Sequence, residues 1–177
     1  MEETTDVSKK SIAIKYGVIG GLVSIIVFVV QDFAGIAGNP DVAWIPTVVS
    51  IVIFAGIIFV AQNDYKKNGD GFLNYGEGLG LGTLVSLVAG IISSIFTYIY
   101  VSFINTAFVE NIRQQQIQAM EEQGMSDVQI EQGMKMAENF SGPTAMLIFG
   151  IIGSVFFGFI VSLIISAFTK NARPEFE

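Results

Sequence analysis

The stretch PTAMLIFGIIGSVFFGFIVSLIISAF, residues 143–168, contains no charged residue. Its apolar residues continue around the whole circumference of a helix, whereas a surface helix of a soluble bundle keeps a polar face. A bilayer core about 30 Å thick needs about 20 mostly apolar residues at the rise of an α-helix. This stretch therefore predicts a transmembrane helix, and not a buried helix of a soluble protein.

Three further stretches are free of Asp, Glu, Lys and Arg, namely residues 16–31, 42–63 and 78–109. Hydrophobic residues make up 51% of the chain and charged residues 14%, against about 25% charged in soluble domains. Mean hydropathy is +0.60. We expect an all-α integral membrane protein in which residues 1–177 form one membrane domain. The expected spans are about 12–31, 43–62, 79–104 and 143–168, with aromatic anchors near their ends at Tyr16, Trp44, Tyr98 and Tyr100.

The chain contains no His and no Cys. This composition excludes thiol nucleophiles, zinc sites built from these residues, and acid–base chemistry by imidazole. A net charge of −7 argues against binding to nucleic acid, because neutralising phosphates requires clustered Lys and Arg. We therefore expect no catalytic residue, no cofactor and no metal, and a protein that is not an enzyme.

The basic residues are divided unevenly among the segments that connect the spans. The third connection carries Arg113 and Lys135, and the first connection, residues 31–41, carries none. Basic residues concentrate on the cytoplasmic side of membrane proteins. Both termini and the second connection are therefore expected in the cytoplasm, and the third connection outside. The seven basic residues on the expected cytoplasmic side are Lys9, Lys10, Lys15, Lys66, Lys67, Lys170 and Arg173.

Small residues after the first span could mark the cleavage site of a signal peptide, at Ala34, Gly35, Ala37 and Gly38. However, the apolar segment is long for a signal peptide, and acids rather than bases begin the chain, at Glu2 and Glu3. We expect the first span to be retained.

Small residues recur at every fourth position in the third and fourth spans. Such spacing places them on one helix face, where two backbones can approach closely in lipid. The two spans are antiparallel because one connection joins them, so we expect the two faces to pack against each other. Chance is the alternative, since Gly and Ser are common in membrane helices. The third span contributes Gly78, Gly82, Ser86, Gly90 and Ser94, and the fourth contributes Gly150, Ser154, Gly158, Ser162 and Ser166.

The third connection, about 105–141, has the spacing of helices instead of that of a loop. Apolar residues follow a helical period from Phe108 to Met120, Gly124 indicates a helix end, and Ser126 with Gln129 indicates a capping box. We expect the third span to continue outward as one long helix, and a second helix to return to the membrane. Six acidic residues lie here: Glu110, Glu121, Glu122, Asp127, Glu131 and Glu138.

Three interpretations of this hairpin stay open. Its apolar stripes could bury each other, or they could bind a protein partner or a second copy, since Met-rich surfaces adapt to varied ligands. A helix lying on the bilayer is disfavoured, because such helices usually carry Lys and Arg on the polar face.

Glu77 is the notable single residue of the second connection, at the start of the third span. A carboxylate there stabilises the helix dipole, and the alternative is a cation or proton site. The segment from Lys66 to Glu77 resembles the spacing of an EF-hand, but Lys66 occupies the first ligand position. The glycines at 76–82 lack the preceding strand and the lysine of a phosphate loop.

Three segments give the chain a family likeness: KKSIAIKYGVIGGLVSI at 9–25, NGDGFLNYGEGLGLG at 68–82, and QQQIQAMEEQGMSDVQIEQGM at 114–134. With these segments the chain resembles the bacterial domain of unknown function 4199 family of small four-span membrane proteins. The resemblance implies a location in the bacterial inner membrane and four spans. It implies no activity and assigns no catalytic residue.

Three functions are compatible with these patterns. The favoured one is a non-enzymatic membrane protein that acts through helix packing and its outer hairpin, as an assembly or interaction partner. The alternative is a small oligomeric transporter or channel, with a pore lined by Ser86, Ser93, Thr97 and Ser154. An intramembrane enzyme is disfavoured, because the expected spans hold no acid and no His or Cys.

Overall fold

The computed structural model describes residues 8–36, 42 and 44–173, so Ala37 and Gly38 of the considered cleavage site lie outside the described residues. The described residues are almost entirely helical, which confirms the predicted fold class. The elements are α1 (Lys9–Phe33), α2 (Trp44–Asn68), α3 (Tyr75–Ile99), the short π-helix η1 (Tyr100–Ile104), α4 (Phe108–Glu122), α5 (Asp127–Ser141) and α6 (Pro143–Thr169).

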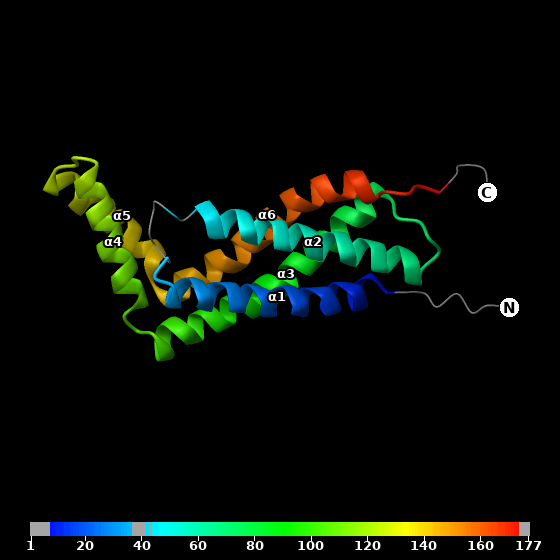
Figure 1. Ribbon diagram of the computed structural model, residues 1–177, viewed down its shortest axis with the longest axis horizontal. Coiled ribbons are helices and arrows are strands. Elements are labelled where there is room, and N and C mark those ends of the chain that lie inside the picture. Colours follow the sequence, from blue (N-terminus) through cyan, green and yellow to red (C-terminus); the bar gives the residue numbers. More distant parts are fainter. Residues whose placement is uncertain (1–7, 37–41, 43, 174–177) are drawn as a thin grey trace.

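Four of these helices are long and apolar enough to cross a membrane: α1, α2, α3 with η1, and α6. They lie side by side in an elongated bundle (Figure 1). The beginning of α1, the α2–α3 connection and the end of α6 lie at one end of the bundle, called here the terminal end. The helices α4 and α5 project from the opposite end, called here the hairpin end.

The helix α3 is the centre of the bundle, because it packs along both α6 and α1. The helix α2 lies across α1 and α6 and has fewer contacts with α3. Close approach between α1 and α3 depends on glycines of α1: a Cβ on Gly21 would lie 2.8 Å from Cβ of Ile92. Large apolar side chains cover the outside of the bundle, as expected for helices that face lipid.

Two polar contacts show that α1 and α3 run parallel in constant register. Lys9 binds Glu77 at the terminal end (3.0 Å), and Tyr100 binds Asp32 at the hairpin end (2.5 Å). Each pair is 68 residues apart in the sequence. The two contacts are separated by roughly 23 residues of helix, or about 35 Å at 1.5 Å per residue. This separation matches a hydrocarbon core of about 30 Å.

The expectation of one long helix from the third span into the hairpin is wrong. After η1 the backbone leaves the helical conformation at Asn105 (φ −121°, ψ 77°), and α4 begins at Phe108. The Asn105 side chain donates a hydrogen bond to Asp32 of α1 at 3.0 Å. The partner that stabilises the break therefore lies on another helix, and the local periodicity could not reveal it.

Candidate functional site

The two faces of small residues on α3 and α6 lie against each other. Each glycine is opposite a serine of the facing helix, and α3 supplies the glycine in three of the five pairs and α6 in two. A Cβ on Gly78 would lie 2.8 Å from Oγ of Ser166, so a larger residue there would require Ser166 to move. The pairs are Gly78 with Ser166, Gly82 with Ser162, Ser86 with Gly158, Gly90 with Ser154, and Ser94 with Gly150.

The serine hydroxyls of this interface are mostly satisfied by their own helices. Ser86 donates to the carbonyl of Gly82 at 2.8 Å, and Ser162 to that of Gly158 at 2.6 Å. Ser154 donates to the carbonyl of Ile151 at 2.8 Å and reaches Ser86 O on the facing helix at 3.4 Å. Close packing is therefore the main attraction between α3 and α6, as in other membrane helix pairs with small residues.

A buried polar cluster joins three helices near the terminal end. The side chain of Gln62 is fully buried, and its Nε2 donates to Gly78 O at 2.9 Å and to Ser166 Oγ at 3.0 Å. Its Oε1 accepts a hydrogen bond from Thr169 Oγ1. Lys66 closes the cluster on its outer side by donating to Thr169 O at 2.8 Å. All these polar atoms have partners, so the cluster is a structural link among α2, α3 and α6.

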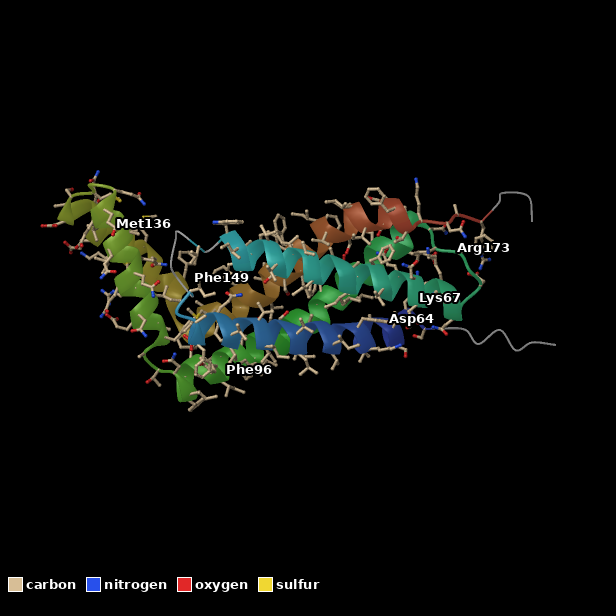
Figure 2. All side chains as sticks on the ribbon, viewed as in Figure 1. Asp64, Lys67, Phe96, Met136, Phe149 and Arg173 are labelled. Carbon is tan, nitrogen blue, oxygen red and sulfur yellow. The ribbon has the colours of Figure 1, made fainter. Side chains whose placement is uncertain are left out.

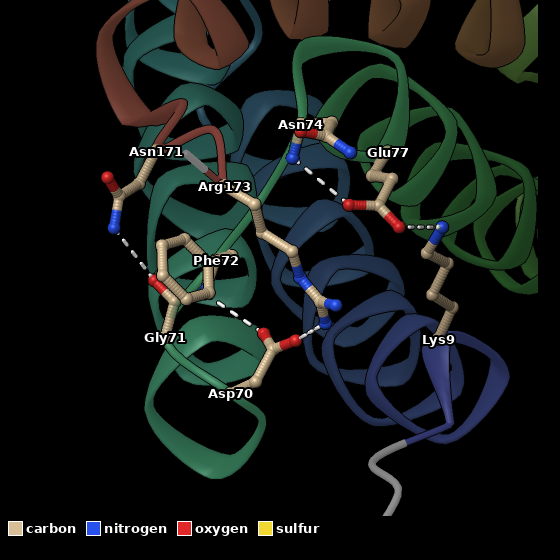
Figure 3. Close-up of polar contacts among 8 residues, drawn as sticks. All are labelled: Lys9, Asp70, Gly71, Phe72, Asn74, Glu77, Asn171 and Arg173. Carbon is tan, nitrogen blue, oxygen red and sulfur yellow. Dashed lines mark hydrogen bonds and ion pairs between the residues drawn. The ribbon is translucent and has the colours of Figure 1, made fainter. Parts of the chain in front are cut away.

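Glu77 has both carboxylate oxygens engaged by the protein itself (Figure 3). Its Oε2 accepts from the backbone N–H of Asn74 at 3.0 Å, which completes a capping box at the start of α3. Its Oε1 accepts from Lys9 Nζ at 3.0 Å. This arrangement favours the helix-start interpretation of Glu77 over the cation or proton site. Among the described residues, no group of three or more acidic side chains is placed to hold a metal ion.

The segment that follows α6 is tied to the α2–α3 connection at the same end (Figure 3). Leu73 and Asn171 exchange two backbone hydrogen bonds, each 2.9 Å long. Asp70 forms an ion pair with Arg173 and accepts from the backbone N–H of Phe72 at 3.0 Å. The acids of the segment that resembles an EF-hand are therefore used in contacts within the protein.

The junction between bundle and hairpin contains residues whose contacts the sequence analysis did not predict. Asp32 belongs to the last turn of α1 and not to the first connection, and Tyr100 is 6% exposed and not an interfacial anchor. The ring of Phe28 contacts those of Tyr100 and Phe108, each at 5.4 Å between centroids. The position of Asp32 at the end of a span was the sequence signal for this junction, but its partners Tyr100 and Asn105 are distant in sequence and could not be identified from it.

The hairpin has the turn that the sequence predicts. Gly124 takes a positive φ of 74° after α4, and Gln129 accepts from the backbone N–H of Ser126 at 2.9 Å in the capping box of α5. Met120 approaches Gly133 between the two helices, and Ile130 is buried. The apolar stripes therefore do pack together in part. The side chain of Glu138 lies outside the described residues.

The packing of the hairpin leaves other apolar side chains of α5 uncovered. Val128 is 63% exposed and Met136 is 73% exposed. Met136 lies on the projecting hairpin (Figure 2), one turn of α5 before Phe140, whose ring contacts that of Phe149 in α6 at 5.3 Å between centroids. The hairpin is thus an acidic helical pair with an unburied apolar surface outside the four-helix bundle.

Comparison with known proteins gives one match. No curated protein and no solved structure matches the chain at a significant level. A family model described as a protein of unknown function, DUF4199, matches residues 15–171, which include most of α1 and the whole of α2, α3, α6 and the hairpin. Because the match extends over nearly the whole chain, the protein belongs to the DUF4199 family.

Proposed function

We propose that the protein is a non-enzymatic component of the bacterial inner membrane that acts as an assembly or interaction partner. In this proposal the four-helix bundle anchors the chain in the bilayer, and the α4–α5 hairpin faces outward and makes the contact. The distribution of charge supports this orientation. Seven basic residues lie at the terminal end and two, Arg113 and Lys135, lie in the hairpin, so both termini are assigned to the cytoplasm.

The observation that carries the proposal is the exposed apolar surface of α5. The exposed apolar residues of the bundle are expected to contact lipid chains. Val128 and Met136 are also exposed, but they belong to a polar hairpin that projects from the end of the bundle, so lipid chains do not account for their exposure. Exposed apolar side chains outside the membrane are a feature of protein interaction surfaces, and Met136 lies one turn from Phe140, which is 60% exposed.

The alternative of a small oligomeric channel draws less support from the placement of the serines. Ser86 and Ser154 lie in the α3–α6 interface against Gly158 and Gly90. Ser93 donates to the carbonyl of Gly90 on its own helix at 3.3 Å. A pore lined by these hydroxyls would require the two helices to separate.

Copurification from native membranes tests the proposal. The tagged full chain is extracted in mild detergent, and recovered proteins are quantified for the wild type and for Met136→Glu, with Glu122→Gln as a matched exposed control on the hairpin. We expect a specific partner, or a second copy, to be lost with Met136→Glu alone, while the unfolding temperature is unchanged. Equal recovery from all variants, or solute flux above that of empty liposomes, would overturn the proposal in favour of the alternative.

A further inference from the structure

A groove runs along the hairpin between α4 and α5. It consists of two adjoining hollows of about 400 and 360 Å³, and Arg113 and Met134 belong to the walls of both. The first hollow extends to the tip of the hairpin at Glu121 and Asp127. The second extends to the base, at Gly142 and Met146. The groove therefore follows the hairpin over the length of α4, about 22 Å at 1.5 Å per residue.

The walls of the groove combine an apolar lining with charged borders. Ile117, Ile130 and Met134 line the hollow near the tip. Ile112, Phe140 and Met146 line the hollow near the base. Charged residues of both helices border this lining, as in grooves that receive the apolar face of an amphipathic helix.

The charge of these borders is negative after the internal ion pairs are counted. Both basic residues are paired within the hairpin, Lys135 with Glu131 at 2.7 Å and Arg113 with Glu110 at 3.9 Å. Among the described residues, Glu121 and Asp127 form no ion pair, and both line the groove near the tip. The tip of the groove thus presents two uncompensated carboxylates.

We propose that this groove binds a basic amphipathic helix of about four turns, carried by a protein partner. This inference rests on the proposed function and names the class of ligand for the same hairpin. The apolar face of such a helix would cover the lining, and its Lys or Arg would lie against Glu121 and Asp127. A second copy of this hairpin is a poor occupant, because it would bring like charges together. The other basic residues of a second copy lie at the terminal end, away from the hairpin.

Binding of designed peptides tests the ligand class. The full chain is reconstituted in nanodiscs of zwitterionic lipid, and 16-residue helical peptides of Leu and Lys, or of Leu and Glu, each with a single photo-leucine, are titrated and crosslinked. Empty nanodiscs are measured in parallel to subtract binding to lipid. We expect the Lys peptide to bind and to crosslink to Ile117 or Met134, with weaker binding at higher salt.

Charge reversal at the tip supplies the matched comparison. Glu121→Lys combined with Asp127→Lys should weaken binding of the Lys peptide about tenfold. Glu122→Lys changes an adjacent acid that does not line the groove and should have a clearly smaller effect. Equal weakening by Glu122→Lys, or equal binding of the Glu peptide, overturns the inference. If copurification still depends on Met136 in that case, the proposed function stands with another ligand; if it does not, both are wrong.

Discussion

Gly158 of α6 lies directly against Ser86 of α3, and the Ser86 hydroxyl occupies the space that a side chain at 158 would need. The same relationship repeats at every fourth residue, with the glycine supplied by α3 in three of the five pairs and by α6 in the other two. One helix therefore supplies a small protrusion wherever the other supplies a gap, which brings two antiparallel backbones close together in lipid.

Replacing Gly158 by leucine should destabilise the bundle, because the new side chain would overlap Ser86. We expect a loss of about 2 kcal/mol or more, seen as a lower unfolding temperature in detergent. Gly153→Leu is the control, since Gly153 is on the same helix and a Cβ there meets nothing within 4 Å. Equal stability of the two variants would show that the glycine–serine interface does not hold α3 and α6 together.

Substitutions of Gln62 should test whether its buried side-chain amide stabilises the bundle. Gln62→Leu removes the links to Gly78 O, Ser166 and Thr169 and should cost about 1–3 kcal/mol. Gln62→Glu should cost more despite its equal size, because a carboxylate cannot donate to the carbonyl of Gly78. Gln118→Glu on the exposed surface of α4 is the control. Thermal unfolding ranks the three variants, and a Gln62→Glu variant as stable as the wild type would contradict this role.

Glu77 variants should separate helix capping from any role of this carboxylate beyond the cap. Glu77→Gln keeps an oxygen that can accept from Asn74 N–H and loses only the partly exposed pair with Lys9, worth less than about 1 kcal/mol. Glu77→Ala also loses the cap and should cost about 1 kcal/mol more. Chemical or thermal unfolding measures both. A Glu77→Gln variant that is folded but loses the association measured for the wild type would point to a role beyond the cap.

Tyr100→Phe should loosen the attachment of the hairpin without unfolding the bundle. The variant loses the 2.5 Å hydrogen bond to Asp32 and leaves Asn105 as the remaining side-chain donor to that carboxylate. We expect faster amide hydrogen exchange over residues 105–110, with exchange in α6 unchanged. Tyr98→Phe, two residues earlier on the same segment, is the control. If Tyr100→Phe and Tyr98→Phe show identical exchange rates over residues 105–110, the hydrogen bond to Asp32 does not stabilise the helix break after η1.

Part of this architecture follows directly from local sequence. The charge-free stretches predict four long helices, and Gly124 with the Ser126–Gln129 box predicts the turn of the hairpin, because helix ends depend on residues only a few positions apart. Several helices are longer than the expected spans. The helix α2, for example, continues from the expected end at residue 62 to Asn68, because a helix can extend with charged residues beyond the apolar core of the membrane.

The remaining features depend on contacts between distant residues. The break at Asn105 depends on Asp32, 73 residues earlier, and the hydrogen bond from Gln62 to Ser166 joins residues 104 positions apart. The pattern of a single sequence indicates helix periodicity, but it does not indicate which residues of different helices contact each other in the bundle. The hairpin groove arises in the same way, from how far α4 and α5 stand apart and not from either stripe alone.

Photo-crosslinking in living cells tests the role of the hairpin most directly. A photoreactive phenylalanine analogue is placed at Met136 on α5 and, as a control, at Phe156, an exposed residue of the membrane helix α6. We predict that Met136 forms one discrete protein adduct on irradiation and that Phe156 does not form it. The absence of any protein adduct at Met136 beyond that at Phe156 would contradict an interaction surface on the hairpin.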